Sequence, residues 1–333
     1  MARILILALP LCMVAACSKS PAGPSTSNPA TVLLGQTVSA VDGSATASVS
    51  VRVGARQPVT TDTNGNFEVE VGGPGTFDVT VRGTDIVERR TTVVNPSEGR
   101  ARLSLIPASF DLTAFDEMFR TSNSRLQRWM SRPALILLAS VMDYRTGSAN
   151  EYSATAEQMS DDEVQQMVAH LNEGLTLLTG GTFTSFESVA VERHSAGARV
   201  GVSREGYIVA GRYNGIVTFA NTIGYGQWHE LSNGRVVGGS MFLDRDFDKD
   251  DSRRRLLRIH ELGHTLGYLH VTSRTSVMNP AVGPEPTDFD RDAPKIAFQR
   301  VPGNRSPDID PGVSGGIFGV TDGVRQVRTI YCK

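Results

Sequence analysis

Three of the six histidines of the chain lie within eleven residues, in the stretch HELGHTLGYLH from His260 to His270. His260 and His264 are four residues apart, so on a helix of about 3.6 residues per turn their side chains share one face. Two imidazoles placed one turn apart can bind the same tetrahedral zinc ion. The spacing therefore predicts a zinc site on a helix.

Gly267 bears on whether His270 can join this site. A helix that continued straight would point residue 270 away from the first two ligands. Glycine can adopt the left-handed conformation that ends a helix and turns the chain. We therefore expect His270 to return to the metal as a third ligand, which leaves the fourth zinc position open for water, as a catalytic site requires.

Glu261 adjoins the first ligand and is the candidate general base. Zinc lowers the pKa of a bound water to about 7. A neighbouring carboxylate can take the proton of that water as it attacks a peptide carbonyl, and can pass it to the leaving amine. The sequence thus predicts a zinc-dependent endopeptidase with one catalytic Zn²⁺ held by His260, His264 and His270.

The extended motif, together with Met278 in SVMNP, resembles the metzincin metallopeptidases, most like the matrixin branch. The resemblance implies a zincin-like catalytic domain over residues 110–303, with the same three ligands and base. It also implies a Met-turn at Met278, which forms an apolar floor beneath the metal without ligating it.

The same resemblance implies an edge strand that pairs with an extended substrate. The stretch VVGGSMFLD (236–244) is similar to that strand. The candidate substrate-binding residues are Gly239, Ser240, Met241 and Phe242. No Cys lies between residues 17 and 332, so the thiolate latch of vertebrate matrixin zymogens is not expected, and Cys332 is interpreted as a near-terminal residue without a role or as an intermolecular thiol.

Two helices and several strands are expected to position the site. Ser160 and Glu163 form a predicted capping box for a helix over 160–178. Asp250, Asp251 and Ser252 are expected to cap the zinc helix. Strands are predicted at 133–141, 187–193, 199–203, 206–210, 215–220 and 236–244, so the expected class is α+β.

Two acidic segments near the zinc helix have structural interpretations. DRDFDKDD (244–251) fails the EF-hand template, because position six is Lys249 and position twelve is Arg255. A solvated acidic turn is the expectation, and a structural Ca²⁺ remains an unsupported alternative. Further on, FDRDAPKIAFQR resembles the closing C-terminal helix of the metzincins, with Asp292 as its expected N-cap. Residues 304–333 are interpreted as a turn-rich tail.

The region 31–106 alternates apolar and polar residues in about seven short segments separated by turn residues. This pattern predicts a small all-β sandwich, with a hairpin at Asn64-Gly65. The stretch TDTNGNFEVEVGGPGTFDVTVRG resembles carboxypeptidase regulatory-like domains, which are immunoglobulin-like sandwiches. It supplies no catalytic residues, so a spacer or a non-catalytic binding domain is expected.

The first 30 residues predict export. A charged start and a short apolar run are typical of a signal peptide and too short to span a bilayer. The stretch VAAC resembles a bacterial lipobox, which implies a signal over 1–16, lipidation of Cys17, a flexible tether over 17–30 and an outer-membrane location in the bacterial envelope. An ordinary signal peptide, with Cys17 there by chance, is the alternative.

Composition and charge limit the partners. The 333 residues carry a net charge of −2, with 20% charged and 40% hydrophobic residues, which is typical of globular proteins and gives no sign of nucleic-acid binding. Protein or peptide substrates are expected, together with a membrane reached through the lipid. The alternative function is an exported zinc-containing binding or adhesion module with an inactive protease site, although Glu261 favours the enzyme.

Overall fold

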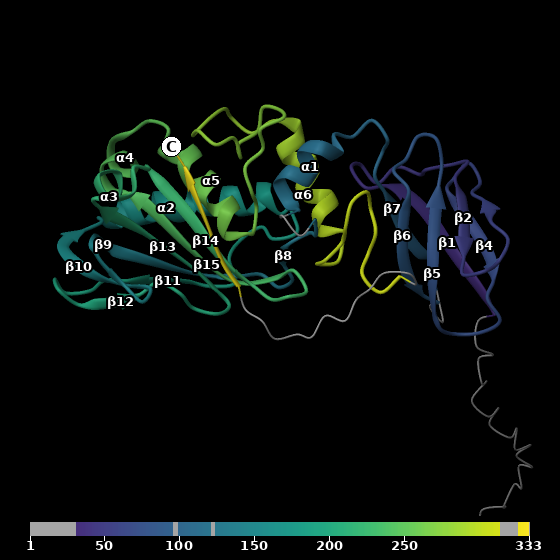
Figure 1. Ribbon diagram of the computed structural model, residues 1–333, viewed down its shortest axis with the longest axis horizontal. Coiled ribbons are helices and arrows are strands. Elements are labelled where there is room, and N and C mark those ends of the chain that lie inside the picture. The colour runs from purple at the N-terminus through teal and green to yellow at the C-terminus, as the bar shows by residue number, and fades with distance from the viewer. Residues whose placement is uncertain (1–30, 96–98, 121–123, 314–325, 333) are drawn as a thin grey trace, which may run out of the picture.

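The computed structural model describes residues 31–332 except for 96–98, 121–123 and 314–325. The predicted signal peptide (1–16), the tether (17–30) and the lipidation site at Cys17 therefore lie outside the described residues. The described part is a mixed α+β protein with three sheets, and Figure 1 shows an all-β part beside a larger part in which helices pack on a sheet. No described helix is both long and apolar enough to cross a membrane.

The first seven strands form two sheets that face each other, as the alternating pattern predicted. One sheet has the order β4-β1-β7 and the other β3-β2-β5-β6. Every second side chain points inward, so Leu33, Val51 and Val79 are fully buried in a shared core. The strands are β1 (Val32–Ser39), β2 (Ser50–Val53), β3 (Val59–Thr60), β4 (Asn66–Glu70), β5 (Thr76–Arg82), β6 (Arg89–Val94) and β7 (Ala101–Leu105).

The turn at Asn64-Gly65 forms, but it does not connect a hairpin. The amide of Gly65 donates to the carbonyl of Asp62 at 2.9 Å, and Gly65 has a positive φ of 73°. The flanking strands β3 and β4 then diverge into different sheets. The predicted hairpin is wrong because a tight turn determines only where the chain reverses. Which strands then pair is determined by packing in the core of the sandwich.

The larger part contains a nine-stranded mixed sheet with the path β12-β10-β9-β13-β15-β14-β16, on which β11 also pairs with β9 and β8 with β15. Parallel pairs join β9, β13 and β15, whereas β14 and β16 run antiparallel to their neighbours. The strands are β8 (Arg128–Trp129), β9 (Ala134–Ser148), β10 (Glu151–Gln158), β11 (Val189–Glu192), β12 (Arg199–Gly201), β13 (Tyr207–Asn214), β14 (Gly224–Glu230), β15 (Arg235–Asp244) and β16 (Gln326–Cys332).

Helices cover one face of this sheet. The second and fifth helices pack on each other and against the sheet through fully buried side chains, among them Leu171, Leu257 and Leu262. The opposite face carries a second core of aromatic residues, in which the rings of Tyr225 and Phe242 stack with centroids 4.2 Å apart. The helices are α1 (Leu112–Phe119), α2 (Asp161–Leu178), α3 (Ile216–Ala220), α4 (Arg245–Asp250), α5 (Arg254–Thr265) and α6 (Asp288–Phe298).

Several predicted elements are confirmed and two are corrected. The buried strand at 133–141 is the first part of β9, and the Ser160–Glu163 capping box begins α2. The predicted strand at 215–220 is instead the short helix α3. Helix α6 begins at Asp288, because Thr287 and Asp290 form a capping box one turn earlier than the predicted cap at Asp292.

The sequence suggested a tail over residues 304–333, but the described residues 304–313 and 326–332 pack against the rest of the protein. Arg89 of β6 donates to Asp308 and to Asp310, each at 2.8 Å, and Asp308 also pairs with Arg300. These charged groups are buried, so they join the sandwich to the larger part through a buried ionic cluster. Further along the chain, β16 completes the nine-stranded sheet beside β14 (Figure 1).

Candidate metal centre

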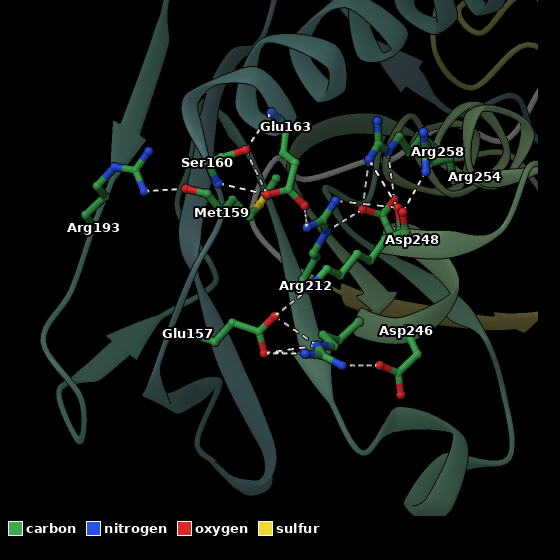
Figure 2. Close-up of polar contacts among 12 residues, drawn as sticks. Glu157, Met159, Ser160, Glu163, Arg193, Arg212, Asp246, Asp248, Arg254 and Arg258 are labelled. Carbon is green, nitrogen blue, oxygen red and sulfur yellow. Dashed lines mark hydrogen bonds and ion pairs between the residues drawn. The ribbon is translucent and has the colours of Figure 1, made fainter.

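Helix α5 carries the candidate ligands and is anchored by a buried carboxylate. The carboxylate of Asp248 in α4 accepts a hydrogen bond from Nε of Arg258 in α5 at 2.7 Å and one from Nε of Arg212 in β13 at 2.6 Å (Figure 2). Because both Asp248 and Arg258 are fully buried, the expectation of a solvated acidic turn is wrong here. The Asp248 oxygens are occupied by guanidinium groups, so this segment fixes α5 to the sheet.

The predicted capping of α5 is also incorrect. Its N-cap is Arg253, which makes no side-chain cap, and Asp251 accepts from the Arg253 amide at 2.7 Å. Asp250 ends α4, and Ser252 lies between the two helices. Helix α4 ends at Asp250, where the cap was expected to begin, and the buried ion pairs of Asp248 hold α5 in place.

The three histidines converge as the spacing predicted. The Nε2 atom of His264 lies 3.1 Å from that of His260 and 3.2 Å from that of His270. Helix α5 ends at Thr265, and Gly267 has a φ of 98°, so the chain turns there and brings His270 back. The turn at the left-handed glycine thus places His270 beside the other two imidazoles, in a group that could hold a metal ion.

The hydrogen bonds of the imidazoles show why this cluster suits a cation. The Nδ1 atoms of His260 and His264 each lie 2.7 Å from a backbone carbonyl oxygen, of Val277 and Tyr268 respectively. A carbonyl only accepts, so both Nδ1 atoms carry the proton, and in the neutral ring both Nε2 atoms present lone pairs. Burial lowers the pKa of His260 to about 4 and that of His264 well below its ordinary value. Facing lone pairs without a proton between them fit a bound metal ion.

Cys332 of β16 supplies a fourth donor, which corrects the interpretation of this residue as one without a role. Its Sγ atom lies 2.9 Å from Nε2 of His260, 3.4 Å from that of His264 and 3.5 Å from that of His270. The four side chains form a group that can hold a metal ion. Strand pairing brings residue 332 across the sheet edge to the histidines.

The spacing of these donors matches tetrahedral zinc. Bond lengths of about 2.05 Å to nitrogen and 2.3 Å to sulfur give donor separations of about 3.3 Å between nitrogens and about 3.6 Å between nitrogen and sulfur. The nitrogen–nitrogen distances of 3.1 and 3.2 Å and the nitrogen–sulfur distances of 3.4 and 3.5 Å are close to these values. The distance of 2.9 Å between the Cys332 sulfur and Nε2 of His260 is shorter than a shared metal ion would give. A set of three imidazoles and one thiolate fits Zn²⁺ chemically.

Glu261 lies beside this cluster with its carboxylate buried. Neither of its oxygens has a hydrogen-bond partner within the part of the chain that the structure describes, and the side chain is fully buried. Burial raises the pKa of Glu261 well above its ordinary value, and the neighbouring Cys332 thiol acts in the opposite direction. A buried carboxylate without a partner at a metal cluster is typical of a catalytic group rather than a structural one.

Met278 packs against the helix that carries His260 and His264. A Cβ atom added to Gly263 would lie 2.5 Å from the Met278 sulfur, so that sulfur packs directly on α5 between the turns that carry His260 and His264. Met278 is fully buried, and its carbonyl accepts from the Val271 amide at 2.9 Å. The residue thus braces both the helix and the segment that follows His270.

The predicted substrate-edge strand lies inside the sheet. β15 pairs with β13 on one side and with β14 on the other, so Gly239, Ser240, Met241 and Phe242 have neighbouring strands at both edges. The assignment of these residues as an edge is therefore wrong. β14 is the strand beside the metal group, and β16 is its second neighbour.

Two glycines allow β14 to pass close to the site. A Cβ on Gly224 would lie 2.8 Å from Oε1 of Glu261, and one on Gly226 would lie 2.4 Å from Cβ of His264. The sequence reasoning missed this strand, because two of its inward positions are glycines and give no apolar alternation. The pair of glycines two residues apart in GYGQWHE was the available signal.

Comparison with known proteins gives no independent assignment. No protein-family model matches the chain, and no curated protein matches its sequence. The residues of the site therefore carry the functional argument.

Proposed function

We propose that this protein is a zinc-dependent endopeptidase with a zincin-like, metzincin-type catalytic domain. The observation that carries the proposal is the convergence of three imidazole Nε2 atoms beside the buried and unpartnered carboxylate of Glu261. His260, His264, His270 and Cys332 would hold the ion. When bound, zinc would supply Lewis acidity that activates water and polarises a peptide carbonyl.

Glu261 would handle the proton. Its carboxylate is placed by the same helix turn as the first ligand and is shielded from solvent. In this position it can accept a proton from water and return it to a leaving amine. Gly224 and Gly226 let the backbone of β14 approach that carboxylate closely, and the Met278 sulfur packs against the ligand helix at Gly263.

The closed donor set supports a second candidate function. A site with four protein ligands has no open position for substrate, and this is typical of structural zinc. A zinc-containing binding or adhesion module with an inactive protease site would use the same residues. The two candidates differ in what happens when Cys332 is removed, because only the enzyme gains a reactive position.

The test therefore uses the full chain with Cys332→Ala, alone and combined with Glu261→Gln. Both proteins are assayed for bound zinc and for casein cleavage. The endopeptidase account expects bound zinc in both and cleavage at least a hundredfold faster in the protein that retains Glu261. Zinc in both proteins without cleavage by either would overturn it and support the module.

We further propose that the chain is exported and anchored to a bacterial outer membrane through lipid on Cys17, with the sandwich as a carboxypeptidase regulatory-like spacer. The lipobox-like VAAC and the absence of catalytic residues in the sandwich support this. Cells fed labelled palmitate should label the wild-type protein and leave a Cys17→Ser variant unlabelled. Equal labelling of the two would contradict the anchor.

A further inference from the structure

β16 lies where an extended peptide would add to the sheet. Seven consecutive residue pairs join it to β14 in antiparallel register, from Gly224 with Cys332 to Glu230 with Gln326. The other edge of β14 is taken by β15. The backbone of β14 beside the metal group is therefore occupied by a strand of the same chain, in the manner of β-augmentation.

Alternate side chains of β16 face the metal side. Gly224 and Gly226 point toward α5, and their cross-strand partners Cys332 and Ile330 share that face. Cys332 reaches the histidines, and Ile330 packs against the core that contains α5. Val327, on the opposite face of the strand, is 53% exposed.

A buried carboxylate fixes the other end of the strand. Glu230 is fully buried and accepts from Nε1 of Trp228 at 3.0 Å, while its second oxygen accepts from Nε of Arg328 at 3.3 Å. Arg328 lies opposite Trp228 and four residues before Cys332. A carboxylate held in this orientation by an indole is suited to select a cationic side chain on whatever strand pairs with β14.

We propose that β16 is an internal pseudo-substrate, which occupies the peptide path along β14 with Cys332 at the metal position and Arg328 in a specificity site formed by Glu230. This inference rests on the proposed endopeptidase function. It assigns a polarity to the substrate, which runs antiparallel to β14 as β16 does. It also assigns a preference, namely a basic residue about four positions before the one at the metal.

The proposal makes the chain its own inhibitor. β16 excludes a substrate in two ways. Its backbone takes the hydrogen bonds at the edge of β14, and its Cys332 takes the fourth position of the metal group. Weakening either contact should favour release of the strand. The Arg328 contact can be weakened without touching a metal donor, so the latency of the chain can be tested apart from its metal chemistry.

The first experiment measures casein cleavage by the full-length wild type and by Arg328→Gln, Cys332→Ala and Val327→Thr variants. Zinc content and thermal melting are recorded for each. Arg328→Gln and Cys332→Ala should each raise the rate at least tenfold over wild type, and Val327→Thr, on the exposed face, should leave it unchanged. A wild type as active as Cys332→Ala would overturn the pseudo-substrate while the endopeptidase stands. Zinc-loaded variants that are all inactive would instead remove the proposed function.

The second experiment tests the specificity site in the Cys332→Ala protein. Quenched fluorescent peptides carry Arg or Glu at each of the five positions before the cleaved bond. Arg should be preferred at least tenfold in kcat/KM at the fourth or fifth of these positions, mainly through KM. Adding Glu230→Gln, which retains an acceptor for Trp228, should abolish the preference, whereas adding Glu68→Gln in the sandwich should not. A preference unchanged by Glu230→Gln would overturn the role of Glu230.

Discussion

The sulfur of Cys332 lies 2.9 Å from Nε2 of His260, although 72 residues separate the two in the sequence. This contact turns a three-histidine site into a four-donor group and links the metal chemistry to the pairing of β16 with β14. Binding of a metal and docking of β16 are thereby coupled, since the docked strand supplies the Cys332 sulfur to the metal and a bound metal would hold that sulfur in place.

Removal of the metal should destabilise the folded chain. Without a cation, the Nε2 lone pairs of His260, His264 and His270 face one another at 3.1 and 3.2 Å in a buried position. A ligand that binds only the folded state raises stability by about 4 kcal/mol at a thousand times its Kd. Calorimetry after dialysis against a chelator should therefore give a lower Tm, which added zinc restores. An unchanged Tm would show that no metal is bound there.

Substitution Gly263→Ala should destabilise the protein by about 1–3 kcal/mol, because the new Cβ would lie 2.5 Å from the Met278 sulfur. Chemical denaturation measures this directly. The matched control is Gly201→Ala, since a Cβ there meets nothing within 4 Å. Combining Gly263→Ala with Met278→Ala should recover part of the loss, and strictly additive effects would contradict the packing of the sulfur on α5.

Substitution Asp308→Ala should lower the free energy of unfolding by about 3–5 kcal/mol, since it leaves Arg89 and Arg300 without their shared buried partner. Burial raises the pKa of Asp308, but the two guanidinium groups outweigh this and hold it below its ordinary value. A loss below 1 kcal/mol in urea denaturation would show that the cluster does not hold the sandwich to the larger part.

The contribution of Glu163 should depend on pH. Burial raises its pKa, but hydrogen bonds from Arg212 and from the Ser160 cap bring it down to about 2, from an ordinary value of 4.5. A depressed pKa means that the stabilisation is complete above pH 4.5 and is lost as the pH falls toward 2. The stability difference between wild type and Glu163→Gln should therefore shrink over this window. A difference that stays constant from pH 5 to pH 2.5 would contradict the assignment.

Local chemistry explains what could be predicted from the sequence. The spacing of His260 and His264 and the left-handed Gly267 are set within a few residues, so the three imidazoles could be placed without a structure. The capping box of α2 is local in the same sense. The cap of α6 was misplaced because Thr287 and Asp290 compete with Asp292 for the same role, and the earlier pair also binds the segment before Met278.

Long-range pairing explains what could not be predicted. Cys332 reaches the histidines only because β16 pairs with β14, and nothing near residue 332 encodes that partner. β14 itself was missed because two of its inward positions are Gly224 and Gly226, where the closeness of α5 leaves no space for a side chain. The order of strands in the sheet depends on such long-range contacts. Because β14 was not recognised, β15 was mistaken for the edge strand.

X-ray absorption at the zinc edge of the purified full chain tests the metal centre most directly. We expect one zinc per chain with three nitrogen neighbours at about 2.0–2.1 Å and one sulfur at about 2.3 Å, the sulfur being lost in Cys332→Ala. A protein that binds no zinc, or a spectrum without imidazole nitrogens, would contradict the account.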